Sequence, residues 1–404
     1  LRIAALALIS ALAVACGGSS DSGSPGTDNR SVTQPPVTQP PVGDNETPDT
    51  PDSNNVDPST GKEIYYRAAD FPNAVNLPLQ FITTSGGKKL SVRVTLPANE
   101  DGTPAAGPFP TVLVQSGYNT NLLSQMFMGV PGNALLGATD SFLVRRGYAQ
   151  VSVDALGTGA SEGSWELFGE EEQQGFADAV DWVPTQSWSN GKIGAAGVSY
   201  MAISALYAAQ RRPDAIQAVF ASLPMGDAYR GTVATGGMLN GLFMSTWMTI
   251  TQFLSTQNVT TALLNPKYMT QLIQITQEHV DQVDRYYLPL IDDAMNGAPL
   301  YTFDSDFWRQ RSPIENIDKV KAPTIILGTV HDIFQRDEPL LYERLKKNNV
   351  DSRLVIYEGS HFGNFVTQHI GVEDVPPSDL LMLQWFDKYL KSMETDTESI
   401  VPVT

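Results

Sequence analysis

The chain has 404 residues, 42% of them apolar, and its 26 basic and 44 acidic side chains give a net charge of −18. The apolar content suffices for a sizeable core and excludes a wholly disordered chain, and the charge argues against nucleic-acid binding because no basic surface would offset phosphate repulsion. The single cysteine excludes a disulfide framework and, with only four histidines, disfavours a structural zinc site, so we expect no metal.

The N-terminus has the pattern of a secretory signal. Residues 1–15 form a basic and then apolar run that is too short to cross a bilayer as a mature helix. The run ends in Ala13-Val14-Ala15-Cys16, which resembles the lipobox of bacterial lipoproteins, with the cysteine as the lipidated first residue of the mature chain. A plain signal peptide with an incidental cysteine is the alternative. We favour lipidation of Cys16 because the only cysteine of the chain falls at this junction.

Residues 16–61 are predicted to be a disordered linker. They are rich in Pro, Ser and Thr, with Val-Thr-Gln-Pro-Pro repeated in tandem at 32–36 and 37–41. Too few apolar groups are present to offset the chain entropy, and paired prolines favour extended polyproline II. Anchor and linker together predict a lipid-anchored protein of the bacterial cell envelope, at the outer membrane and either periplasmic or exposed on the surface. It would meet a membrane only through its lipid.

From residue 62 onward, β-rich runs alternate with helical patterns. This alternation is typical of a mostly parallel sheet with helices on both faces, which is an α/β fold. The predicted strands are residues 90–96, 111–115, 148–154, 193–196, 215–221, 324–328 and 353–357. The predicted helices are residues 133–146, 170–183, 200–211, 337–347 and 378–391.

The pattern changes between the predicted strands at 215–221 and 324–328. Residues 225–312, approximately, are rich in Met, Trp, Phe and Leu and show no obvious strand, so we predict a helical cap inserted into the sheet domain. Ordinary helices packed on one side of the fold are the alternative. Trp247 and the apolar residues around it are expected in the core rather than in contact with a substrate.

The stretch around Ser199 has the context of a nucleophile elbow. A short strand leads through Gly197 and Val198 to Ser199 and then directly into a helix. Such a turn holds the serine Oγ above the sheet, next to the amide groups of a helix N-terminus. Met201 stands where the commoner G-x-S-x-G pattern has glycine, and a serine at this position could also be a simple N-cap.

Two later strand ends supply the partners that a nucleophilic serine needs. A serine hydroxyl requires a base, and the base requires an acid that fixes its tautomer. Asp332 follows the strand at 324–328, and His361 follows the strand at 353–357 with glycines on both sides, which gives the order Ser…Asp…His. His331 is the main competitor, but its position next to Asp332 directs it away from the serine. We therefore predict Ser199, Asp332 and His361 as the catalytic residues.

Several motifs together carry a family resemblance. They are G-V-S-Y at 197–200, D-A-L-G-T-G-A-S-E-G at 154–163, Q-S-W-S-N-G-K-I-G at 186–194, D-F-W-R at 306–309 and G-T-V-H-D at 328–332. With these motifs, residues 79–390 resemble the cocaine esterase and X-Pro dipeptidyl-peptidase group of α/β hydrolases. The resemblance implies an α/β-hydrolase domain over residues 62–404 that cleaves a small ester, amide or short peptide through an acyl-serine, without a cofactor.

The resemblance also implies an oxyanion hole. The run P-T-V-L-V-Q-S-G-Y-N at 110–119 resembles the family strand whose final tyrosine donates from its hydroxyl, here Tyr118, and the backbone N–H of Tyr200 is the second donor. A tyrosine packed at a strand end is the alternative for Tyr118.

The sequence departs from the family pattern at three places. Leu156 replaces an arginine and Ala202 replaces a glycine. The family usually continues into a C-terminal β jelly-roll, which we do not expect within residues up to Thr404; truncation and a short family member both fit this observation.

The substrate class stays open at the level of sequence. We expect an esterase or acylase, with an X-Pro dipeptidyl-peptidase-like enzyme as the alternative and a non-catalytic lipoprotein that binds a ligand as a further one. A peptidase of this kind needs carboxylates that hold a free amine. The candidates are Glu166, Glu170, Glu171, Glu172, Asp304 and Asp306, for which a solvated acidic face is the simpler interpretation.

Overall fold

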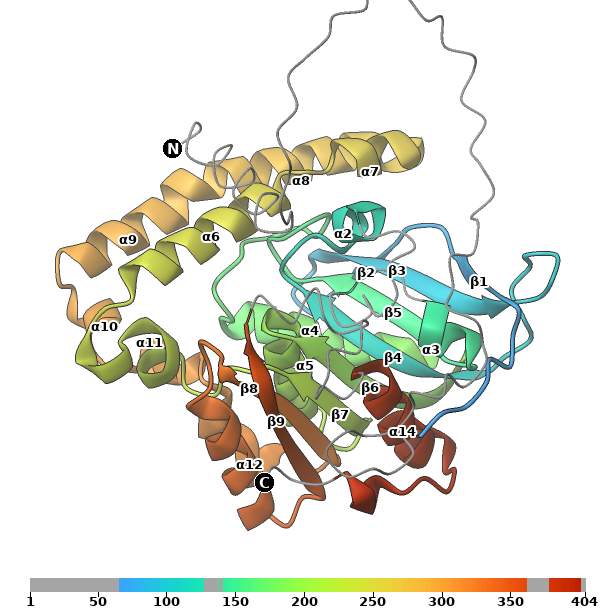
Figure 1. Cartoon of the computed structure of the whole chain (residues 1–404). Coiled ribbons are helices and arrows are strands. Elements are labelled where there is room, and N and C mark those ends of the chain that lie inside the picture. Colours follow the sequence, from blue (N-terminus) through green and yellow to red (C-terminus); the bar gives the residue numbers. More distant parts are fainter. Residues whose placement is uncertain (1–64, 127–136, 138–140, 362–377, 401–404) are drawn as a thin grey trace, which may run out of the picture. The chain divides into compact units, whose positions relative to one another are not determined.

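The computed structural model describes residues 65–126, 137, 141–361 and 378–400, with no account of the Ser399 side chain. The predicted signal, Cys16 and the linker over residues 16–61 lie outside the described residues. All described residues belong to one compact unit, Pro48–Thr404, which is built on a single sheet with helices on both faces (Figure 1).

Nine strands of this unit form the sheet, in the order β1-β3-β5-β4-β6-β7-β8-β9, with β2 also paired to β3. The strands are β1 (Asn73–Asn76), β2 (Gln80–Thr83), β3 (Lys89–Ala98), β4 (Phe109–Ser116), β5 (Ala149–Asp154), β6 (Ser189–Val198), β7 (Ile216–Ser222), β8 (Thr324–His331) and β9 (Ser352–Ser360). The strands from β5 to β9 pair in parallel, whereas β3 is antiparallel to β1, β2 and β5. The predicted α/β class is confirmed.

Two layers of helices cover the sheet. On one face lie α3 (Ser141–Arg145) and α14 (Ser378–Lys391), and on the other lie α4 (Glu170–Trp182), α5 (Tyr200–Arg211) and α12 (Asp337–Lys347) (Figure 1). Because both faces are covered, β4 and β5 are buried along their whole length. The run Val112-Leu113-Val114 of β4 is apolar, as expected for such a strand, whereas β5 also buries Gln150, Ser152 and Asp154. Three glutamates in the first turn of α4 favour a helix start there through the helix dipole.

One predicted helix is described only in part. The helix predicted over residues 133–146 is α3, Ser141–Arg145, in the part of that range that the structure describes. Gly137 lies in a turn with φ of 76°, a left-handed conformation that suits glycine. The buried Arg93 guanidinium donates to the carbonyl oxygens of Gly137 at 2.6 Å and Thr120 at 2.7 Å, and these bonds stabilise the turn.

The segment between β7 and β8 is helical, as the sequence indicates. Its α-helices are α6 (Gly241–Ser255), α7 (Val259–Leu264), α8 (Met269–Gln282), α9 (Leu288–Met295), α10 (Pro299–Thr302) and α11 (Asp306–Gln310). Shorter turns of other helix types are η3 (Ala228–Val233), η4 (Thr235–Gly237), η5 (Pro266–Tyr268), η6 (Val283–Tyr287) and η7 (Pro313–Lys319). Outside this segment lie α2 (Thr120–Met126), η2 (Val183–Thr185) and η8 (Thr397–Ser399). Over the described residues, every helix is too short or too polar to cross a bilayer.

Candidate active site

Ser199 lies in a sharp turn between β6 and α5. Its backbone has φ of 55° and ψ of −120°, a strained conformation for a residue with a side chain. The strand and the helix approach each other closely, since a Cβ at Gly197 would lie 2.3 Å from the backbone carbonyl carbon of Met201. The turn predicted from the sequence is therefore present, and only glycine fits at position 197.

The side chains of Ser199, His361 and Asp332 form one hydrogen-bonded chain. Ser199 Oγ lies 2.8 Å from His361 Nε2, and His361 Nδ1 lies 2.8 Å from Asp332 Oδ2. Asp332 Oδ1 also accepts a bond from the backbone N–H of Phe334 at 2.5 Å. With a proton on Nδ1, the imidazole donates to the carboxylate and presents a free electron pair to the serine hydroxyl.

The strand order explains why three distant residues meet. Ser199 follows β6, Asp332 follows β8 and His361 follows β9, and these strands run parallel within the order β6-β7-β8-β9. Their carboxyl ends therefore meet at one edge of the sheet, the edge at which such folds bind ligands. The Phe334 ring packs edge-on against the imidazole, with 5.2 Å between ring centroids, and all three polar side chains are buried.

The alternatives for these residues do not match the geometry. Ser199 occupies the N-cap position of α5, but its side chain makes no capping hydrogen bond. The His331 side chain is 69% exposed and lies near Glu358. His279 is buried, with its two ring nitrogens each 3.0 Å from a backbone carbonyl oxygen, which indicates a structural role.

Tyr118 and Tyr200, the two residues predicted to form the oxyanion hole, have neighbouring rings, with 5.6 Å between their centroids. Tyr118 follows β4, and its hydroxyl is within reach of the Ser199 side chain and accepts a bond from Trp247 Nε1 at 2.9 Å. Burial raises the pKa of Tyr118 to about 12, so it stays a neutral donor at physiological pH. Tyr200 is the first residue of α5, and the first N–H groups of a helix have no carbonyl partner within that helix.

The side chain of Tyr200 has a hydrogen-bond partner of its own. Its hydroxyl donates to the buried carboxylate of Glu172 in α4, which also accepts from the backbone N–H of Phe168 at 2.8 Å. Burial raises the pKa of Glu172 to about 7. Glu172 thus supports the helix that carries Tyr200, and its carboxylate is already engaged.

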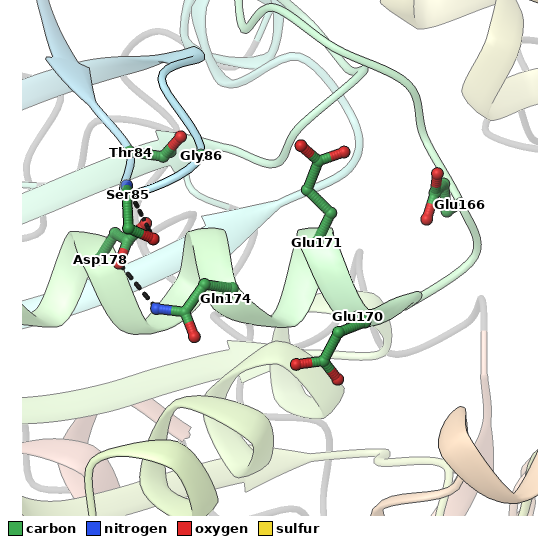
Figure 2. Close-up of a pocket in the computed structure, with 8 residues that line it drawn as sticks. All are labelled: Thr84, Ser85, Gly86, Glu166, Glu170, Glu171, Gln174 and Asp178. Atoms are coloured by element: carbon green, nitrogen blue, oxygen red, sulfur yellow. Dashed lines mark hydrogen bonds between the residues drawn. The ribbon is translucent and has the colours of Figure 1, made fainter.

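Of the five remaining candidates for amine binding, four form ion pairs. Three of the six, Glu166, Glu170 and Glu171, line a hollow of about 470 Å³ beside the first turn of α4, together with Thr84, Ser85, Gly86, Gln174 and Asp178 (Figure 2). Ser199, Asp332 and His361 do not line this hollow. The ion pairs are Glu170 with Arg211, Glu171 with Lys88, Asp304 with Arg230 and Arg309, and Asp306 with Arg309.

Leu156, which replaces the arginine of the family pattern, is an apolar core residue here. It is buried, and a Cβ at Gly175 of α4 would lie 3.3 Å from its Cδ1. An aliphatic side chain therefore fills the space between this loop and α4.

Trp247 is the residue whose role the sequence did not indicate. We expected it in the core, and its ring does pack against other aromatic rings, but its indole N–H bonds the hydroxyl of Tyr118. The two residues are 129 positions apart, and neither lies in a motif that points to the other. Among the described residues, no group of three or more His, Cys, Asp or Glu side chains is placed to hold a metal ion.

Comparison with known proteins places the chain in a family of hydrolases. The model of the X-Pro dipeptidyl-peptidase (S15) family matches residues 86–363. Cocaine esterase from a Rhodococcus species is 24% identical over 320 residues, which are 74% of this chain and 53% of that protein. Xaa-Pro dipeptidyl-peptidase from Lacticaseibacillus casei is 24% identical over 294 residues, 67% of this chain and 34% of that protein.

A solved structure shows the same architecture. A CocE/NonD family hydrolase from Staphylococcus aureus has a TM-score of 0.56 to this chain at 21% identity, over 80% of this chain and 52% of the other. The mixed sheet with helices on both sides is thus an α/β-hydrolase fold. Since the family model covers more than half of the sequence, the chain belongs to the X-Pro dipeptidyl-peptidase (S15) family. The chain spans 53% of the length of the Rhodococcus relative and 34% of the length of the Lacticaseibacillus relative.

Proposed function

We propose that this protein is a serine hydrolase that cleaves carboxylic ester or amide bonds through an acyl-serine intermediate. The observation that carries the proposal is the hydrogen-bonded chain from Ser199 through His361 to Asp332, with the serine in a left-handed turn at the start of α5. Such a chain is the arrangement that makes a serine hydroxyl nucleophilic at neutral pH. Membership of the S15 family supports the same conclusion.

In the first half of the reaction, His361 Nε2 takes the proton of Ser199 as Oγ attacks the substrate carbonyl carbon. The carbonyl oxygen becomes an oxyanion and accepts hydrogen bonds from the Tyr118 hydroxyl and the Tyr200 N–H. Asp332 stabilises the imidazolium. The tetrahedral intermediate then collapses, His361 gives its proton to the leaving alcohol or amine, and the acyl group stays on Ser199.

In the second half, water attacks the acyl-serine. His361 takes a proton from this water, the same two donors hold the second oxyanion, and the intermediate expels Ser199 Oγ, which regains its proton from His361. The carboxylic acid leaves and the enzyme is restored. Each protein group used in these steps is a side chain or backbone N–H of this chain, so the proposed reaction needs no cofactor.

An ester is the preferred substrate class. Binding of a free amine would require an unengaged carboxylate near Ser199, and five of the six candidates in the described residues already pair with a cation or a hydroxyl. The cocaine esterase relative acts on an ester, as its name states. Peptidase activity on X-Pro substrates is the second candidate, which the description of the matching family favours.

A fluorophosphonate probe tests the proposal directly. We expect the probe to label the wild-type protein and to leave the folded Ser199→Ala variant unlabelled, because the probe reacts with an activated serine. The same variant should lose more than about 10³-fold of the p-nitrophenyl butyrate hydrolysis rate. A folded wild-type protein that the probe does not label would instead indicate a ligand-binding module on a hydrolase scaffold. Parallel assays with p-nitrophenyl esters and an Xaa-Pro anilide then separate the esterase from the peptidase.

We further propose that lipidated Cys16 anchors the domain to the bacterial cell envelope, with residues 16–61 as a tether. The apolar run before Cys16 and the proline-rich composition after it support this. Expression in a bacterium supplied with an alkyne-tagged fatty acid should tag the wild-type protein and spare Cys16→Ser. Equal tagging of both proteins, or of neither, would contradict the anchor.

A further inference from the structure

Helix α6, in the segment between β7 and β8, contacts Tyr118, the proposed hydrogen-bond donor to the oxyanion. Trp247 lies in α6, and its Nε1–H donates to the hydroxyl oxygen of Tyr118 at 2.9 Å. An indole N–H can only donate, so the Tyr118 oxygen is the acceptor in this bond. The phenolic hydrogen of Tyr118 must therefore point away from Trp247. The Ser199 side chain is a second hydrogen-bonding neighbour of Tyr118. Against the larger effect of burial, which raises the pKa of Tyr118, this interaction lowers it.

The next residue along the chain is tied to the same helix. Asn119 Nδ2 donates to the carbonyl oxygens of Leu254 at 3.0 Å and Gln257 at 3.2 Å, at the end of α6 and just beyond it. Asn119 also adopts a left-handed φ of 59°. Two consecutive residues after β4 are thus fixed to α6, one near the middle of the helix and one at its end.

The ring of Trp247 is itself held in place by aromatic packing. It lies edge-on to Trp165 at 5.1 Å between centroids and nearly parallel to Phe243 at 6.2 Å and to Phe168 at 6.4 Å. Phe168 in turn stacks on Tyr200 at 4.4 Å. These contacts define the direction of the indole N–H, which is what a directional hydrogen bond requires.

We propose that Trp247 is a positioning residue for catalysis, whose indole N–H directs the Tyr118 hydroxyl toward the oxyanion. The bond has two effects. It limits the phenolic hydrogen to orientations that face the reacting carbonyl, and it polarises the O–H group, since hydrogen bonds in a chain strengthen one another. Trp247 touches neither the substrate carbonyl nor Ser199 in this role. The inference rests on the proposed serine hydrolase function and makes α6 part of its oxyanion hole.

The decisive variant is Trp247→Phe, which keeps an aromatic ring in the cluster and removes the N–H. We expect kcat for p-nitrophenyl butyrate to fall about 5- to 30-fold with KM changed less than about twofold, because the lost interaction acts on the transition state. Tyr118→Phe removes the donor itself and should cost about 10²-fold or more. In the Tyr118→Phe background, adding Trp247→Phe should change kcat less than about twofold, because no hydroxyl remains to be directed.

Trp308→Phe is the matched control. Trp308 is buried in α11 and donates from Nε1 to the carbonyl oxygen of Tyr301 at 3.0 Å, so the same substitution removes an equivalent bond elsewhere in the insert. Its effect on kcat should be small and should multiply with that of Tyr118→Phe. The inference is overturned if Trp247→Phe retains wild-type kcat, or if its effect multiplies fully with that of Tyr118→Phe. An inactive, unlabelled wild-type protein would reject the proposed function itself.

Discussion

Glu338 is a buried carboxyl next to the proposed catalytic acid. Its side chain is fully buried in α12, and neither of its oxygens has a hydrogen-bond partner among the described residues. A Cβ at Gly328 of β8 would lie 2.0 Å from Glu338 Oε2, so the carboxyl occupies space that only glycine leaves open. Burial, followed by the negative charges of Asp332 and Asp337, raises the pKa of Glu338 to about 9. The group is therefore protonated at neutral pH.

This pKa predicts a pH dependence of stability. In the unfolded chain a glutamate ionises near pH 4.5, so between that pH and about 9 the folded state binds the extra proton and the free energy of unfolding falls as pH rises. The loss approaches about 1.4 kcal/mol per pH unit for one proton. Glu338→Gln stays neutral and should remove this slope. In urea denaturation, the free energy of unfolding of the variant should therefore rise relative to that of the wild type from pH 5 to pH 9.

Glu343→Gln is the control on the same helix. Glu343 is exposed and pairs with Lys347 at 2.7 Å, so its substitution should leave the pH profile of unfolding nearly unchanged. If the Glu338→Gln and wild-type profiles run parallel between pH 5 and pH 9, Glu338 is not a protonated buried group.

At the scale of elements, the site depends on how closely α5 crosses the sheet. Gly197 lets the helix approach β6, and the left-handed Ser199 reverses the chain within one residue. The ring of Tyr200 lies so near the β4 loop that a Cβ at Gly117 would be 3.0 Å from it. The glycines at the ends of β6 and β4, Gly197 and Gly117, thus allow Ser199, the first amides of α5 and the segment after β4 to lie close together.

These element-scale features explain which parts could be predicted from the sequence. Ser199, Asp332 and His361 could be assigned because each directly follows an apolar strand, and parallel strands bring their carboxyl ends to one edge of the sheet. The strands β1 and β2 were not predicted because each has only four residues and only one residue of the two strands, Ile82, is buried, so that their hydrophobic patterning is weak.

Two features of the site, the roles of Trp247 and Glu338, could not be predicted for a different reason. The role of Trp247 depends on the packing of α6 against the segment that follows β4. The hydrophobic periodicity of the sequence gives no indication of this contact. Glu338 has the pattern of an ordinary acidic residue in the first turn of a helix, and only the tertiary structure buries it. Contacts between distant segments that share no motif cannot be predicted from a single sequence.

At the scale of the whole described unit, one carboxylate of α14 joins the segment before β1 to the segment that leads into β5. Asp387 of α14 is fully buried and accepts hydrogen bonds from Tyr65 at 2.9 Å and from Tyr148 at 2.7 Å. It also accepts two bonds from the guanidinium of Arg67, at 2.8 and 3.0 Å. Tyr65 is the first described residue and Tyr148 precedes β5, so three segments far apart in sequence converge on this carboxylate.

Loss of the Asp387 charge should destabilise the whole unit. Asp387→Asn keeps the size of the side chain but leaves the largely buried Arg67 guanidinium with only the half-exposed Asp70 as a counter-charge, which should lower the free energy of unfolding by about 3 kcal/mol. Combining it with Arg67→Met should cost less than the sum of the two single changes, because the same interaction is lost in each. Urea denaturation measures all three variants. Asp214→Asn breaks an exposed pair with Lys321 and should cost less than about 1 kcal/mol. An equal effect of Asp387→Asn and Asp214→Asn would mean that the buried Asp387 contacts do not stabilise the unit.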